Sequence, residues 1–179
     1  MSWQLRRAGV SDLEAIMAIE SSVFQGDAWS DEAMRADLAS PHCYYLVALP
    51  VETPTAPSQV AELAGYAGLL APRGAKEADI QTIAVAPEAR RRGLGRVLMI
   101  SLLNEARRRG AREVFLEVRA DNPNAEALYA SLGFERIGIR PHYYQPDDVD
   151  AVVMRAPLPE TETRWAEAAQ SHMTERIEP

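Results

Sequence analysis

The stretch from which the fold can be read is Arg90–Arg96, RRRGLGR, in which four arginines surround two glycines. It follows the apolar segment Ile80–Val85, which predicts a strand. It opens into Gly93–Arg109, where apolar residues recur at helical spacing. The first amides of a helix have no intrahelical partner, and the helix dipole adds positive potential there, so anions bind at such ends. The stretch therefore fits a phosphate cradle, and it fits a solvated cluster of charges equally well.

The two residue types of this turn would serve a phosphate in different ways. Glycine has no Cβ, so a pyrophosphate can approach the backbone closely, and arginine adds charge-assisted hydrogen bonds from the rim. The turn is not a P-loop, because it lacks Gly-Lys-Ser/Thr. It is not the dinucleotide-binding fingerprint either, because no third glycine follows Gly95 at the required spacing.

Composition restricts the class of protein. The chain has 179 residues, of which 47% are apolar and 25% charged, and this fits one soluble domain with a real core. A formal net charge of -7 argues against binding nucleic acid and favours a cationic partner. No apolar run reaches the roughly 20 residues of a membrane helix, and the start, MSWQLRRAG, has no signal-peptide pattern. We therefore expect no membrane association.

Cysteine usage points to a reducing, cytoplasmic setting. Cys43 is the single cysteine, so an intramolecular disulfide and a cysteine-based zinc site are both excluded. His42 and His172 show no metal-ligand spacing, and we expect no metal. Cys43 itself is most simply a small core residue.

Working outward from the turn, hydrophobic spacing and capping residues predict one α/β domain with a mixed sheet. A capping box at Ser11–Glu14 starts the first helix, Ser30 caps the second, and Asn122 with Pro123 starts the last. Gly110 ends the helix that begins at Gly93. Strands are expected at Gln4–Arg7, Tyr44–Leu49, Leu63–Leu70, Ile80–Val85, Glu113–Arg119, Arg136–Tyr144 and Ala151–Ala156.

Two segments interrupt or follow this domain. The domain is expected over residues 1–157, with a proline- and threonine-rich loop at about 50–60 (PVETPTAPSQ) that cannot form a central strand. Residues 158–179 form an acidic C-terminal tail.

Three stretches carry a family resemblance when they are read together. They are Ile83–Val85 followed by Arg-x-x-Gly-x-Gly, then LEVRADN at 116–122, then ALYASLGF at 127–134. This set resembles the GNAT superfamily of acetyl-CoA-dependent N-acetyltransferases. With RPHYY at 140–144, it is similar to the ribosomal-protein alanine N-acetyltransferases within that superfamily (the RimI type). The resemblance spans Trp3 to Ala156 and implies a mostly antiparallel sheet of about seven strands with about four helices.

The resemblance also implies a site. It places acetyl-CoA on the backbone of the Ile83–Val85 strand, on the Arg-rich turn and on the Asn122 side chain, and the general base and acid on Glu117 and Tyr129. The implied cofactor residues are Ile83, Ala84, Val85, Arg91, Arg92, Gly93, Leu94, Gly95, Arg96 and Asn122. The implied substrate residues are Phe24, Trp29, Tyr143 and Tyr144.

The chemistry of acetyl transfer gives these residue types a use, although each also has a structural explanation. An α-amine with a pKa of about 7.7–8.0 must lose a proton before it attacks. Glu117 lies mid-strand, where partial desolvation would make it a base; alternatively it pairs with an arginine across the sheet. Tyr129 is an acid for the leaving thiolate, a core tyrosine, or both. Strand neighbours point to opposite faces, so only one of Tyr143 and Tyr144 is expected to face a substrate.

The function implied is transfer of acetyl to the N-terminal α-amine of a protein, a basic ribosomal protein with N-terminal alanine, by direct attack in a ternary complex. Two alternatives stay open: acetylation of a small-molecule amine or an internal lysine, and a non-catalytic acyl-CoA-binding or ribosome-assembly module. The protein is expected to be a monomer or weak dimer. The loop between Phe24 and Trp29 is longer than the compact Phe-Pro-Trp-Ser form of the family, and this departure bears on substrate choice.

Overall fold

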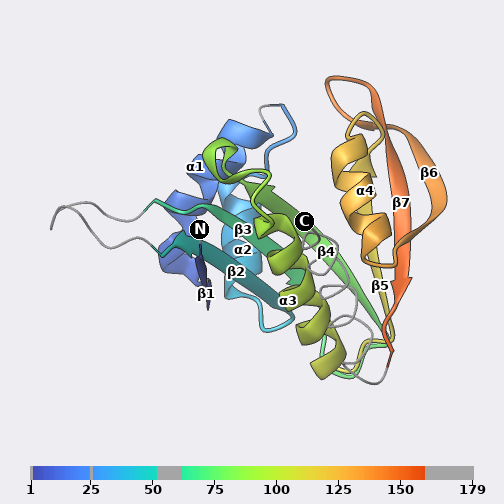
Figure 1. Ribbon diagram of the computed structural model, residues 1–179, viewed down its shortest axis with the longest axis horizontal. Helices are drawn as coiled ribbons and strands as arrows, with labels where there is room; N and C mark the ends of the chain where they lie inside the picture. Colours follow the sequence, from blue (N-terminus) through green and yellow to red (C-terminus); the bar gives the residue numbers. More distant parts are fainter. Residues whose placement is uncertain (1, 25, 52–61, 160–179) are drawn as a thin grey trace, which may run out of the picture.

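The computed structural model describes residues 2–24, 26–51 and 62–159 (Figure 1). Most of the predicted 50–60 loop and all but the first two residues of the predicted 158–179 tail lie outside this part. The division into a domain at 1–157 and a tail therefore stays a prediction.

Seven strands form one sheet in the order β1-β2-β3-β4-β5-β7-β6. All neighbouring pairs are antiparallel except β4 and β5, which are parallel. The predicted fold class is confirmed, and β4 begins three residues earlier than expected. The strands are β1 Trp3–Arg7, β2 Cys43–Pro50, β3 Gly65–Leu70, β4 Glu77–Val85, β5 Glu113–Arg119, β6 Glu135–Tyr144 and β7 Val149–Pro157.

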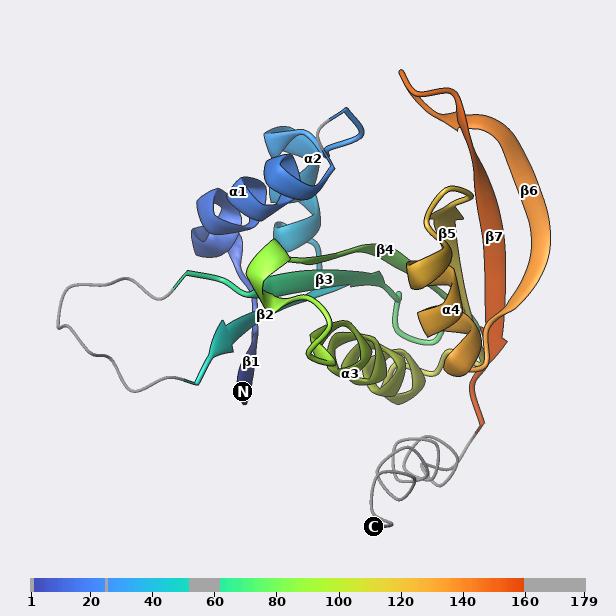
Figure 2. The same cartoon turned by 45° about the horizontal axis from the view of Figure 1, so that its top comes forward.

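Helices cover both faces of the sheet, and Figure 2 shows α1 and α2 opposite α3. Leu13, Ile16 and Ile19 of α1 pack with Met34 of α2 against strands β2 and β3. The apolar side of α3 packs on the other face, in the same core as the buried residues of α4, β5 and β7. The helices are α1 Leu13–Val23, α2 Asp31–Ala39, α3 Leu94–Arg108 and α4 Pro123–Ser131.

The parallel strands β4 and β5 separate soon after they meet. They pair only where Glu77–Asp79 faces Glu113–Phe115. Beyond this point β5 continues alongside β7 as far as Arg119, while β4 follows β3 as far as Val85. The sheet is therefore split at its centre, and the upper halves of β4 and β5 border an opening in which alternate backbone groups have no strand partner.

Local signals gave most helix ends correctly. The Ser30 and Asn122 side chains accept from the amides of Ala33 and Ala125, both at 3.2 Å, and Gly110 has a φ of +103°. The capping box at Ser11 is wrong. A 3₁₀ turn precedes α1, and the side chain used there is that of Asp12, which accepts from the Gly9 amide at 2.9 Å and pairs with Arg6.

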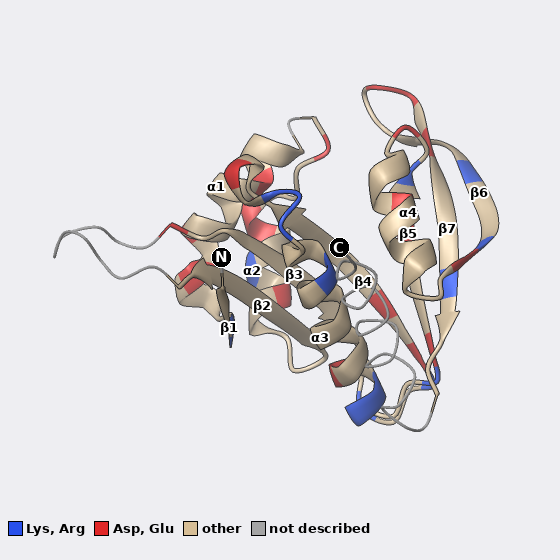
Figure 3. Cartoon of the chain, viewed as in Figure 1, with Lys and Arg blue, Asp and Glu red and all other residues tan. Residues whose placement is uncertain are grey.

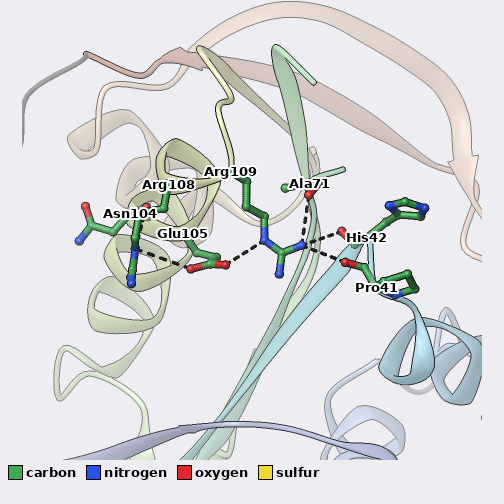
Figure 4. A network of polar contacts seen from close by, with 7 residues as sticks. All are labelled: Pro41, His42, Ala71, Asn104, Glu105, Arg108 and Arg109. Atoms are coloured by element: carbon green, nitrogen blue, oxygen red, sulfur yellow. Dashed lines mark hydrogen bonds and ion pairs between the residues drawn. The ribbon is translucent and has the colours of Figure 1, made fainter. Parts of the chain in front are cut away.

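Arg109, at the end of α3, fastens the helix to the sheet (Figure 4). Its side chain is 3% exposed, and its Nε lies 2.8 Å from the Glu105 carboxylate. Its Nη1 donates to three backbone carbonyls, those of Pro41, His42 and Ala71, at 3.4, 3.3 and 3.1 Å. One buried cation thus joins the end of α3 to the residues just before β2 and to the residue just after β3.

Arg109→Met should lower the free energy of unfolding by about 3 kcal/mol, because it leaves buried carbonyls and a carboxylate without their cation. The control is Arg108→Met, whose side chain is 68% exposed and which should change stability by less than about 0.5 kcal/mol. Urea unfolding monitored by circular dichroism measures both. Equal losses in the two variants would contradict the role of Arg109.

Candidate active site

A cleft of about 810 Å³ occupies the opening between β4 and β5. Its walls are the upper half of β4, the turn that leads into α3, the end of β5 and one side of α4. Of the residues predicted to hold the cofactor, all but Arg92 line it, and so does Tyr129. Arg92 was placed there because it lies within the motif, but in the structure it lies outside the cleft. The cleft residues used below are Ile83, Ala84, Val85, Arg90, Arg91, Gly93, Leu94, Gly95, Arg96, Asn122 and Tyr129.

The turn before α3 has the shape that an anion site requires. Gly93 is the N-cap of the helix at a φ of +80°, a conformation that glycine adopts without strain, and it has no side chain to occupy the first amides. The Arg90 guanidinium donates to the Val85 carbonyl at 3.1 Å and so fastens the turn to β4. A Cβ on Gly95 would lie 3.3 Å from the Leu128 side chain, so the cradle is narrow at this point.

The Asn122 side chain has two uses. Its carbonyl oxygen caps α4 through the amide of Ala125, which leaves the NH₂ group as a donor for a ligand in the cleft. The capping bond therefore fixes the orientation of the donor.

Tyr129 is a core tyrosine that also lines the cleft, so both of its predicted roles are compatible with its place. The residue is 6% exposed and packs against Phe134 with ring centroids 6.1 Å apart. Burial raises the pKa of its hydroxyl to about 12, so the phenol keeps its proton at neutral pH. A protonated phenol is the form that a general acid needs.

A second hollow, here called the groove, adjoins the cleft across β5. It has a volume of about 770 Å³ and is lined by residues of β4, β5 and the β6–β7 hairpin. The cleft and the groove share Asp27, Trp29, Glu117 and Tyr144 among their lining residues. Glu117 thus lies where the two hollows meet.

Two neighbours hold the Glu117 carboxylate at this junction. Arg140 of β6 pairs with it, Nη1 to Oε1, at 2.6 Å, so the predicted alternative of an ion pair across the sheet is realised within the site. Tyr143 is the second neighbour, and the pKa of its hydroxyl is raised by Glu117 and by burial. The side chain of Glu117 is 28% exposed, so it still reaches solvent in the hollows.

Both tyrosines of the β6–β7 hairpin line the groove, although regular strand alternation would turn them to opposite faces. Their ring centroids lie 5.1 Å apart at 89°. His142 has a φ of +57°, and the register with β7 shifts between Arg140 and Tyr144. This irregularity breaks the alternation of side chains that a regular strand would impose.

The loop between α1 and α2 forms the opposite wall. Of the two residues predicted to bind the substrate from this loop, Trp29 lines both the cleft and the groove, and Phe24 lines the cleft alone. Glu20 of α1, which sequence reasoning missed, anchors this loop. It is 1% exposed, accepts from the Trp29 amide at 2.9 Å and receives a hydrogen bond from the Tyr66 hydroxyl. Burial raises its pKa. A signal was available, because a carboxylate one turn after Ile16 falls on the buried stripe of the helix.

The groove is acidic. Glu77 and Asp79 of β4 line it together with Glu117, and Figure 3 shows the acidic residues along the lower halves of β4 and β5. The pKa of Asp79 is raised by burial and by the negative charges of Glu77 and Glu117. Such a field favours a cationic group in the groove.

A family model described as "Acetyltransferase (GNAT) family" matches residues 13–134, which is more than half of the chain. The chain belongs to the GNAT family. The resemblance read from the sequence is thereby confirmed, and the cleft lies between the stretches that carried it. Among the described residues no helix is long and apolar enough to span a membrane.

Two mycobacterial GNAT relatives match over 148 residues, 81% of this chain. An uncharacterised protein of Mycobacterium leprae is 40% identical, and the match spans 38% of that longer protein. The N-alpha-acetyltransferase RimI of Mycobacterium tuberculosis is 39% identical over 86% of its length. The crystal structure of the ribosomal-protein-S18-alanine N-acetyltransferase from Escherichia coli is similar at a TM-score of 0.74 and 30% identity, covering 90% of this chain and 97% of that one.

Proposed function

We propose that this GNAT protein transfers an acetyl group from acetyl-CoA to the N-terminal α-amine of a protein while both substrates are bound. The observation that carries the proposal is the position of Glu117, where a cleft suited to a pyrophosphate meets an acidic, aromatic groove suited to an amine, with Tyr129 in the wall of the cleft. The names of the M. tuberculosis and E. coli relatives agree with it.

The residues present in the cleft fit acetyl-CoA. The first amides of α3 and the Arg91 and Arg96 side chains would hold the pyrophosphate, and the Asn122 amide would hold the pantetheine arm. The free side of β4 at Ile83–Val85 would bind the arm as an added strand does, with the Val85 amide placed for the carbonyl oxygen. The co-substrate supplies an activated thioester carbonyl, and the protein supplies alignment and proton transfer.

The proton steps follow from Glu117 at the junction and from Tyr129 in the wall of the cleft. Glu117 takes a proton from the substrate ammonium, directly or through one water, and the neutral amine then attacks the carbonyl carbon. A C–N bond forms and the C–S bond breaks. Tyr129 donates its hydroxyl proton to the departing sulfur, and the second proton lost by the attacking nitrogen returns Tyr129 to its phenol form. Arg140 and Tyr143 keep the Glu117 carboxylate in place throughout.

Tyr129→Phe should lower kcat about a hundredfold and leave the Kd of acetyl-CoA nearly unchanged, because the ring still packs on Phe134 while the proton donor is lost. Initial rates and calorimetric titration of the same preparation measure the two quantities. A fall in acetyl-CoA affinity as large as the fall in kcat would assign Tyr129 to binding instead.

The substrate we propose is a basic ribosomal protein with N-terminal alanine, as the name of the E. coli relative states for that enzyme. The acidic groove and the net charge of -7 support a basic partner. A cytoplasmic location and a monomeric or weakly dimeric state belong to the same proposal. Gel filtration at several concentrations tests the oligomeric state.

A peptide panel tests the function. The protein is incubated with acetyl-CoA and an alanine-initial peptide that contains one internal lysine, with its N-terminally blocked form, and with a small primary amine. Fragmentation mass spectrometry locates the acetyl group. Acetyl on the α-amine alone is expected. Acetyl only on lysine or on the small amine would overturn the α-amine assignment, and cofactor binding without any turnover would favour a non-catalytic module.

A further inference from the structure

The three loops at the open end of the sheet meet at one arginine. Arg119, the last residue of β5, pairs through Nη1 with Asp27 of the α1–α2 loop. It binds Asp121, in the turn after β5, through two nitrogens at 3.0 Å each. Its Nη2 also lies 3.1 Å from Asp147 of the β6–β7 loop. A single guanidinium therefore joins segments that are far apart in the sequence.

Arg119 also contacts a wall of the groove directly. Its Cζ lies 5.3 Å from the ring centroid of Tyr144, which lines both the cleft and the groove. Asp27 lines both hollows from the opposite side. The contact between Arg119 and Asp27 thus links the two walls between which a substrate amine would enter, and we call this ion pair the bridge.

The bridge leaves one polar atom unused. The side chain of Asp27 is 13% exposed, and among the described residues its Oδ1 is buried without a hydrogen-bond partner, while Oδ2 receives Arg119. A buried carboxylate oxygen without a donor is unfavourable, and buried polar atoms in native structures usually have partners. Because no described residue donates to Oδ1, Arg119 compensates the charge of the Asp27 carboxylate only in part, and Asp27 lines both hollows, where a ligand N–H can interact with that charge.

The charges around the bridge indicate whether the N–H donor of the ligand is cationic or neutral. Three carboxylates, from Asp27, Asp121 and Asp147, surround one guanidinium, so the cluster has two more negative charges than positive ones. The groove beside it adds Glu77, Asp79 and Glu117. A cationic N–H donor is therefore favoured over a neutral one.

We propose that the bridge determines peptide specificity: Arg119 positions Asp27, and the Asp27 carboxylate, which lines both hollows, attracts a cationic N–H group near the N-terminus of the substrate. This proposal rests on the proposed function, since it concerns the same groove. Arg119 acts through Asp27 and Tyr144 and is a positioning residue.

Two variants break the bridge from either end. Asp27→Asn keeps the size of the side chain and removes its charge, and Arg119→Gln removes the guanidinium. Each should raise the KM of an alanine-initial peptide about tenfold, with kcat within about threefold and the Kd of acetyl-CoA unchanged. The double variant should raise the peptide KM no further than either single variant does, because the two residues act as a unit.

Asp147→Asn is the matched control. Asp147 also contacts Arg119, but its side chain is 56% exposed and it lines neither hollow, so the peptide KM should stay within about twofold. Thermal melting of all variants checks that each is folded. Peptides with arginine or alanine as second residue separate the two possible donors: a penalty with the arginine peptide alone assigns the side chain, and a penalty with both assigns the α-ammonium group.

The outcomes separate this proposal from the function on which it rests. An unchanged peptide KM in folded Asp27→Asn and Arg119→Gln, with the wild-type protein active on the α-amine, would overturn the bridge alone. Losses that fall equally on kcat and on acetyl-CoA binding would also overturn it, because they would show a merely structural role. Absence of α-amine acetylation by the wild-type protein would overturn the proposed function, and the bridge proposal with it.

Discussion

Gly95→Asp should abolish acetyl-CoA binding, with Kd raised by at least about a thousandfold, while the protein stays folded. Gly95 lies in the first turn of α3, where the free amides would hold the pyrophosphate. A carboxylate at this position would occupy those amides and repel the phosphates, and like charges in contact cost several kcal/mol, about 1.4 kcal/mol for each factor of ten. The helix itself tolerates the change, because a negative side chain near its N-terminus is favourable.

Calorimetric titration with acetyl-CoA measures the effect, and thermal melting confirms folding. Arg91→Ala is the graded comparison. It removes one rim cation and leaves the turn amides in place, so affinity should fall only about tenfold. A Gly95→Asp protein that binds acetyl-CoA within tenfold of wild type would contradict the assignment of the turn as the pyrophosphate site.

Glu117→Gln should lower kcat between about a hundredfold and ten-thousandfold at pH 7, and this deficit should narrow, by less than about tenfold, as the pH rises towards 9. The α-amine has a pKa of about 7.7–8.0, so above this range it loses its proton without help from a base. Glutamine keeps the shape of the side chain and a hydrogen-bonding oxygen for Arg140, so the junction should remain intact.

Initial rates across this pH range at saturating acetyl-CoA provide the test. The control is Asp79→Asn, a second carboxylate of the same groove whose loss changes the field but removes no base at the junction. The ratio of the Asp79→Asn rate to the wild-type rate should vary little with pH. A Glu117→Gln deficit that is equally large at pH 7 and pH 9 would remove Glu117 from the role of general base.

The parts of the site that local sequence could predict are those built by neighbouring residues. The strand–turn–helix around Gly93 follows from an apolar run, a glycine at a positive φ and a helical stripe, all within one segment. In the caps at Ser30 and Asn122, a side-chain oxygen accepts from the backbone amide three residues later in the chain. The family motifs then pointed to Glu117 and Tyr129, which line one cleft, but periodicity alone could not reveal the opening because strand separation is a property of pairing.

The parts that could not be predicted depend on contacts between distant segments. Asp27 and Arg119 lie 92 positions apart, and neither a charge pattern nor a hydrophobic period relates them. The pairing of Arg140 with Glu117 requires the order β5-β7-β6, in which a strand that comes later in the chain lies between them. That Tyr143 and Tyr144 line one groove could not be predicted from strand alternation, because His142 adopts a positive φ that its residue type does not announce.

The central claim is that the cleft and the groove hold both substrates together and that acetyl passes directly between them. Initial rates measured while acetyl-CoA and an alanine-initial peptide are varied together test it most directly. We expect double-reciprocal lines that intersect, and no acetyl group retained on the protein after incubation with radiolabelled acetyl-CoA alone. Parallel lines together with a stable acetylated protein would contradict the account.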